Sequence, residues 1–273
     1  MKSNYRYIVK AFMAMAVIAG TTSCDDFLDR EPMSSISPET YYSTAAQLEA
    51  NLNDEYPNVL PSFGQWTYGI FGEDKGTDNQ IEVNANDRYT QDRWKVPHSE
   101  SDNWKFERIY RINFFLSEAL PKFGEDMSGS QNTISGSVAT IKHYIGEMYF
   151  LRAYEYFKKL QLFGDFPIIN QPLADEMEAL REASKRFPRN EVARFIISDL
   201  DKAYAYMSDV DMATTRINKD VAMLVKSRVA LFEATWLQNF KGTAFVPGGE
   251  GWPGASLPVS YTHLRAHETE ADL

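Results

Sequence analysis

The stretch 137–164, SVATIKHYIGEMYFLRAYEYFKKLQLFG, carries the strongest structural signal in the chain. Two sets of side chains recur at helical spacing, one with Val138, Ile141, Ile145, Met148 and Arg152, and the other with Tyr144, Leu151, Tyr154 and Phe157. Apolar residues on most sides are typical of a helix at the centre of a helical array. We therefore expect a buried helix from about Ser137 to Phe163, ended by Gly164 and then by Pro167, which cannot continue a helix.

Four further helices are expected around this central one. The first begins at Ser37, a good N-cap followed by Pro38, and runs to Asp54 or Asn58, before Pro61. The others span Asn103–Leu120, Asn190–Met207 and Asn218–Phe240, each with apolar residues near helical spacing. On the last of these, the residues expected to face inward are Val221, Leu224, Val225, Val229, Phe232 and Trp236.

Short connectors between these helices predict antiparallel helix pairs, as in an α-solenoid. The tetratricopeptide consensus is not found at its 34-residue period, so this prediction rests on the helix pattern. Gly146 and Ala153 are small, and we expect them to let neighbouring helices approach the central helix closely.

The segment from Pro61 to about Ser101 lacks helical periodicity and is rich in Gly, Asp, Asn and aromatic residues. A loop of about 40 residues is unusual inside a compact domain and is commonly functional. Its oxygen-rich part, from Asp74 to Glu82, does not match the calcium-loop pattern. We therefore predict a solvated loop there and no metal site.

The N-terminus reads as a secretory signal peptide over residues 1–23. A basic head precedes a short apolar run, 11–20, and small polar residues follow. The run is too short to span a bilayer, which needs about 20 apolar residues. Cys24, the single cysteine, stands where a bacterial lipobox places the thiol that is acylated, although Thr21 occupies the usual Leu position. We predict lipidation of Cys24, with simple secretion as the alternative, and a lipid-attached tether over 24–36.

Composition restricts the possible partners. Without the three basic residues of 1–23, the chain has 25 basic and 38 acidic residues, a formal charge of −13. An acidic chain without a basic tract argues against nucleic acid and against docking on anionic lipid. No HExxH, P-loop or GxSxG motif is present, and no cofactor is predicted.

The segment Gly146–Ile169, GEMYFLRAYEYFKKLQLFGDFPII, resembles the signature helix of the SusD/RagB family. Met148 and Phe163 replace an Ala and a Tyr of that signature. The stretches 104–113 (WKFERIYRIN), 188–200 and 218–231 are similar to three further helices of the family. The resemblance covers about residues 20–245.

This resemblance implies an all-α dominated fold of tetratricopeptide-like helix pairs, a SusD-like α-solenoid with long irregular loops. It implies a cell-surface lipoprotein of the outer membrane that captures oligosaccharides and is not an enzyme. The protein would pass its ligand to a SusC-like TonB-dependent transporter, and the Cys24-Asp25-Asp26 start resembles the surface-export signal of Bacteroidota lipoproteins. A polysaccharide hydrolase and a helical protein-binding scaffold are the alternatives.

In this family the sugar-contacting residues tend to lie in the loop after the first helix and in the second half of the protein. The resemblance therefore nominates Asp78, Arg88 and Trp94 as glycan-binding residues, and Trp66 is added from its loop position. Their alternative roles are an exposed turn, a surface charge and aromatic caps over the helices. Arg152 is expected to be structural, an ion-paired or capped residue near Glu155.

The end of the chain departs from the family pattern. Family members are roughly double this length, and residues 260–273, SYTHLRAHETEADL, resemble nothing in them. We expect residues 37–258 to be a partial SusD-like helical domain and 259–273 to be a non-native tail, with a divergent short paralogue as the alternative. The last helix would then expose apolar residues, and a 24–258 fragment is expected to aggregate.

Overall fold

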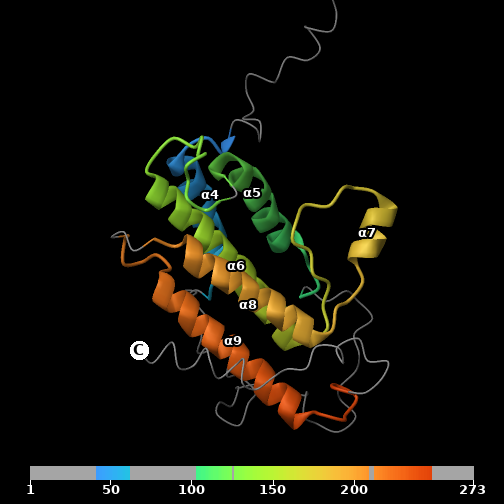
Figure 1. Ribbon diagram of the computed structural model, residues 1–273. Coiled ribbons are helices and arrows are strands. Elements are labelled where there is room, and N and C mark those ends of the chain that lie inside the picture. The colour runs from blue at the N-terminus through green and yellow to red at the C-terminus, as the bar shows by residue number, and fades with distance from the viewer. Residues whose placement is uncertain (1–40, 62–102, 125, 209–211, 248–273) are drawn as a thin grey trace, which may run out of the picture. The chain divides into compact units, whose positions relative to one another are not determined.

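The computed structural model describes residues 41–61, 103–124, 126–208 and 212–247 (Figure 1). Six helices lie in these ranges: α4 (Ala45–Val59), α5 (Glu107–Phe123), α6 (Val138–Phe163), α7 (Met177–Ala183), α8 (Arg189–Tyr206) and α9 (Lys219–Asn239). The described part has isolated β-bridges but no strand, which confirms the all-α prediction. None of its helices combines the length and apolar character needed to cross a bilayer.

Helix α6 is the central element, as predicted. It packs against α4, α5 and α8, and α9 packs mainly against α8 (Figure 1). Most of its residues are buried, and Ile141, Ile145 and Met148 are fully so. Ser137 caps its start by accepting a hydrogen bond from the Thr140 N–H at 3.4 Å. Burying each such apolar side chain stabilises the fold by about 1.5–3 kcal/mol, so α6 is its main apolar contributor.

Gly146 is a point of very close approach between α6 and the end of α8. A Cβ atom there would lie 2.8 Å from the Met207 backbone nitrogen and 2.9 Å from the Ala203 carbonyl oxygen. Both contacts are shorter than a carbon atom tolerates. The expected close approach at Gly146 is therefore confirmed, and it requires glycine.

The helix predicted from Ser37 to Asp54 or Asn58 is not continuous, and its predicted start at Ser37 lies outside the described residues. Tyr42 and Ser43 form a turn, and α4 begins only at Ala45. Thr44 is its N-cap and forms a capping box with Gln47, whose side chain accepts the Thr44 N–H at 3.1 Å. This reciprocal pair satisfies two backbone donors that a continuous helix would bond otherwise.

Three other helix ends also differ from the prediction. Helix α5 begins at Glu107 rather than Asn103, and it continues through Pro121 to Phe123. Helix α8 begins at Arg189, with Pro188 at the N-cap position. The predicted Asn218 cap of α9 is confirmed, because its side chain accepts the Val221 N–H at 3.0 Å.

The inward face predicted for α9 is partly wrong. Val229 is buried, but Val221 is 38% exposed and Leu224 is 69% exposed. Lys226 and Glu233 are buried instead. Lys226 pairs with Asp201 at 2.5 Å, and Glu233 pairs with Arg189 at 2.8 Å, so ion pairs with α8 occupy part of the inner face.

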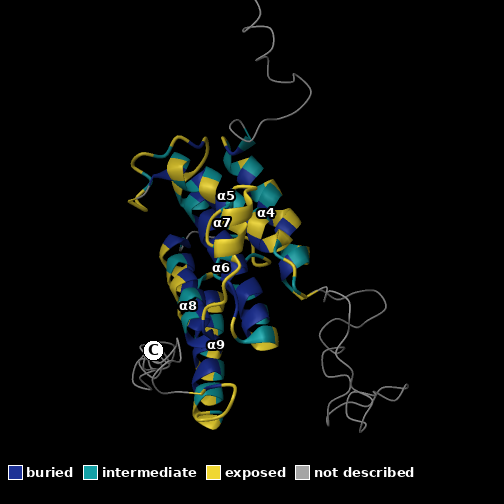
Figure 2. Ribbon diagram, turned by 90° about the vertical axis from the view of Figure 1, so that its right-hand side faces the viewer, coloured by how far each residue is buried: buried dark blue, intermediate teal, exposed yellow. Residues whose placement is uncertain are grey.

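Helix α7 was not predicted. Figure 1 shows it joined to the other helices by a loop on each side, and Figure 2 shows its surface as mostly exposed. None of its residues is buried, and Met177 and Leu180 are among the exposed apolar side chains. The weak apolar pattern of this segment explains why periodicity did not reveal a helix.

Candidate functional site

The residues nominated from the sequence lie outside the described residues. These are Cys24 for lipidation and Trp66, Asp78, Arg88 and Trp94 for glycan binding. They stay predictions. The signal peptide, the tether and the tail after residue 258 also lie outside the described ranges.

Within the described residues, an apolar cavity of about 360 Å³ lies beside the start of α5. Trp104, Phe106 and Tyr110 line one part of it, and the segment 167–175 and residues of α7 line the rest. Gln171, Asp175 and Ser184 are its polar lining residues. Its volume is in the range of small-ligand pockets, and mostly apolar walls with a few polar groups are typical of them.

The aromatic wall of this cavity is held by a buried ring, Phe166. The Trp104 ring meets Phe166 edge-on at a centroid distance of 4.9 Å, and Phe106 stacks on Phe166 at 5.2 Å. The Arg186 guanidinium lies over the Trp104 ring at 4.7 Å. Tyr110, by contrast, is 51% exposed, so its ring is accessible to a ligand.

A second, polar cavity of about 370 Å³ lies along the middle and end of α5. Its polar lining residues are Asn113, Ser117, Arg152, Asn170, Gln171 and Lys202, and the rings of Tyr149 and Phe195 also line it. Gln171 lines both cavities, so they adjoin the same residue. The two cavities therefore form one candidate site with an apolar part and a polar part.

Arg152 forms the buried floor of the polar cavity. Its Nε and Nη2 donate to the Asp199 carboxylate at 2.6 and 2.8 Å, and its Nη1 donates to Asn113 Oδ1 and the Asn170 carbonyl. Burial lowers the pKa of Arg152, but the hydrogen bonds and charge of Asp199 outweigh this and raise it. Arg152 is ion-paired as expected, but its partner is Asp199 and not Glu155.

The segment between the cavities is held from beneath by Tyr156. The Tyr156 hydroxyl accepts from the Ile169 N–H at 2.8 Å and donates to the Ile169 carbonyl at 3.0 Å. Burial raises the pKa of Tyr156, so the hydroxyl keeps the proton that it donates. Asn113 donates to the same carbonyl at 2.9 Å. Helices α5 and α6 thus fix the backbone at Ile169, close in sequence to Gln171, which lines both cavities.

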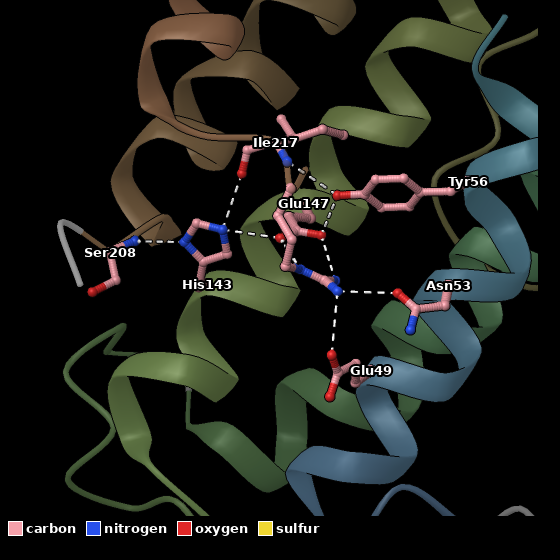
Figure 3. Close-up of polar contacts among 8 residues, drawn as sticks. Glu49, Asn53, Tyr56, His143, Glu147, Ser208 and Ile217 are labelled. Atoms are coloured by element: carbon pink, nitrogen blue, oxygen red, sulfur yellow. Dashed lines mark hydrogen bonds and ion pairs between the residues drawn. The ribbon is translucent and has the colours of Figure 1, made fainter. Parts of the chain in front are cut away.

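A second buried polar cluster surrounds Glu147 (Figure 3). Its carboxylate accepts two hydrogen bonds from Arg216 at 2.8 Å and one from the Tyr56 hydroxyl at 2.6 Å. His143 Nε2 lies 2.9 Å from Glu147 and 3.0 Å from the Ile217 carbonyl, while Nδ1 faces the Ser208 N–H at 3.2 Å. Because Nδ1 accepts, the neutral ring carries its proton on Nε2.

This cluster joins α4, α6 and the residues before α9. Glu147 is fully buried, and both of its oxygens are engaged. Arg216 also reaches Asn53 of α4 at 3.0 Å. Such saturation fits a structural clamp and leaves little capacity for a ligand. No group of three or more potential metal ligands occurs in the described parts of the chain.

Comparisons with known proteins consistently match the chain to one family. A family model described as "Starch-binding associating with outer membrane", of the SusD-like group, matches residues 26–231. SusD-like protein P2 of Formosa agariphila is 25% identical over 95% of this chain and 49% of its own length. SusD-like protein P25 of the same organism is 25% identical over 78% of this chain and 41% of its own length. The chain thus spans about half or less of these relatives.

Solved structures show the same likeness at lower identity. A SusD-like protein from Bacteroides fragilis is 18% identical, with a TM-score of 0.47 over 80% of this chain and 41% of that chain. A laminarin-binding SusD-like protein is 20% identical, with a TM-score of 0.38 over 49% of this chain and 26% of that chain. The assignment rests on the family match, which covers most of the chain. The chain belongs to the SusD-like family.

Proposed function

We propose that this chain belongs to a cell-surface lipoprotein that captures oligosaccharides at the outer membrane. The observation that carries the proposal is the family match over residues 26–231, whose description names starch binding and association with the outer membrane. Lipid attachment at Cys24 would hold the protein on the membrane, and a SusC-like TonB-dependent transporter would receive the glycan.

The candidate site has the chemistry that a sugar needs. Sugar rings present patches of C–H bonds that pack on aromatic faces, and the accessible Tyr110 ring offers such a face. Their hydroxyl groups need hydrogen-bonding partners, and Gln171, Asp175 and Asn170 line the two cavities. We propose that the loop residues Trp66, Asp78, Arg88 and Trp94 contribute further contacts.

Hydrolysis of the bound glycan is the alternative to binding without cleavage. Glycosidases use two carboxylates that flank the scissile bond. Among the described residues that line the apolar cavity, Asp175 is the one carboxylate. We propose binding without cleavage, and the test therefore measures both.

The test is affinity electrophoresis of the purified chain in gels that contain plant and host polysaccharides, with reducing ends assayed in parallel. We expect retardation by at least one glycan without new reducing ends. Cleavage would make the protein an enzyme, whereas failure to bind any glycan would favour the scaffold.

A matched pair of variants connects the binding to the site. Tyr110→Ala removes the exposed ring and should weaken binding by about 0.5–1.5 kcal/mol, or about two- to twelvefold. Tyr204→Ala is the control, because Tyr204 is similarly exposed, at 44%, and does not line either cavity. Equal binding by both variants would contradict the placement of the glycan at Tyr110.

A further inference from the structure

The polar cavity has an excess of positive charge in its wall. Arg152 and Lys202 line it, and both face one carboxylate, Asp199. Arg152 and Asp199 are buried and form a bidentate pair, whereas Lys202 lies 3.7 Å from Asp199 and its side chain is 43% exposed. Two cations with one anion leave a net charge of +1. This local sign is opposite to the chain's formal charge of −10.

No carboxylate lines the polar cavity among the residues that the structure describes. The apolar cavity differs in this respect, because Asp175 lines it. An anionic group would therefore meet no like charge from the described lining of the polar cavity. The same group would be repelled by Asp175 in the neighbouring one.

Neutral donors line the same cavity as the partly exposed ammonium group of Lys202. Lys202 lies over the Tyr149 ring, with 5.3 Å between Nζ and the ring centroid, and Arg152 lies 5.2 Å from the same centroid. Burial raises the pKa of Tyr149 to about 12, so its hydroxyl stays protonated at neutral pH. The exposed side chains of Asn170 and Gln171 add amide N–H groups.

Arg152 also has donor capacity beyond its structural bonds. Four of the five N–H groups of its guanidinium make the hydrogen bonds to Asp199, Asn113 and Asn170. The cavity thus combines a partly exposed ammonium, a phenol and amides around a buried guanidinium. Charge-assisted hydrogen bonds of this kind are the strong ones for carboxylate and sulfate oxygens.

We propose that the polar cavity is a subsite for an anionic sugar substituent, either the carboxylate of a uronic acid or a sulfate ester. The inference rests on the proposed function, because it names the class of glycan that this site selects. Since Gln171 lines both cavities, a glycan that crosses it places a neutral ring in the apolar cavity and the charged unit in the polar one.

The test is calorimetry of the purified chain with two pairs of probes. The first pair is an oligogalacturonate and its methyl ester, and the second is a sulfated galactan oligosaccharide and its desulfated form. We expect the charged member of at least one pair to bind about three- to fivefold more tightly at low salt, as for a partly exposed ion pair. Raising the salt concentration should reduce this preference.

Lys202→Gln should abolish the preference for the charged probe over its neutral counterpart. Lys241→Gln is the control, because Lys241 is exposed, follows α9 and does not line the cavity. Preference for the oligogalacturonate identifies a carboxylate ligand, and preference for the sulfated probe identifies a sulfate ester. Equal binding of charged and neutral probes overturns this inference alone, whereas binding of none of the four contradicts the proposed function as well.

Discussion

Replacing Gly146 with alanine should destabilise the protein, although the same change usually stabilises a helix. In the interior of a helix, replacing glycine with alanine ordinarily stabilises a protein by about 0.8–1.0 kcal/mol. Here the added Cβ would lie 2.8 Å from the Met207 nitrogen and 2.9 Å from the Ala203 oxygen. These two atoms form the last backbone hydrogen bond of α8, at 2.8 Å, so neither can rotate away. Helix α8 must shift as a unit.

The magnitude follows from these two opposing effects. Overpacking a filled core costs about 1–3 kcal/mol, and contacts with backbone atoms favour the upper part of this range. After the gain in helix propensity is subtracted, Gly146→Ala should lower the free energy of unfolding by about 1–2 kcal/mol. For a chain of this size the melting temperature should fall by about 2–8 °C.

The assay is urea denaturation followed by circular dichroism, with thermal melting as a second measurement. Lys142→Gly and Lys142→Ala form the control pair, because residue 142 is on the same helix and is only partly buried. Their difference measures the glycine-to-alanine gain without the contact to α8. If Gly146→Ala is as stable as the wild type, or more stable, the close approach at Gly146 does not limit packing and the argument is refuted.

Three other changes are predicted. Glu147→Gln leaves Arg216 without its buried partner and should cost about 3–5 kcal/mol in urea denaturation, whereas Glu178→Gln, in an exposed pair, should cost less than about 1 kcal/mol. Burial raises the pKa of Glu55 above its ordinary value of 4.5, so the unfolded chain releases this proton at lower pH than the folded one. As the pH rises from 4.5 to 7, the free energy of unfolding of the wild type should therefore fall relative to that of Glu55→Gln, as measured by urea denaturation. A difference in stability that does not change with pH would contradict this. Cys24→Ser should abolish fatty-acid labelling and membrane association, and continued labelling would exclude Cys24 as the acylated residue.

Much of the fold was predictable because the residues of the central helix themselves indicate that it is buried. Apolar side chains on most sides of 138–163 indicate burial, and Ser137 and Gly164 mark the two ends. These signals are local, so they can be read without knowledge of the neighbours. The first predicted helix shows the limit of such reading, because Thr44 provides an N-cap inside the range that was predicted as one helix. The Thr44–Gln47 capping box, which joins two side chains to two backbone N–H groups, marks the start of α4.

The two cavities could not be predicted, because their residues come from segments distant in sequence. Trp104 begins the stretch 104–113, which resembles a helix of the family, but nothing in that stretch indicated that Trp104 lies beside residues 167–175. No sequence pattern marked Lys202 as a candidate binding residue. Its significance comes from Asp199, one turn away, and from Arg152 on another helix. A candidate site of this kind is visible only once α5, α6 and α8 are packed together.

Helix α9 shows why apolar periodicity can assign the wrong face. Its buried side holds Lys226 and Glu233 beside Val229 and three alanines, while Leu224 is exposed, so the buried side is less apolar than periodicity predicts. The reason is that both charges are buried and have partners on α8: Lys226 pairs with the partly exposed Asp201, and Glu233 pairs with the buried Arg189. A buried charge without its partner is strongly destabilising, whereas a single exposed leucine is not. The ion pairs therefore favour this rotation of α9. The sequence of α9 alone does not show which of its charged residues have partners, because those partners lie on α8.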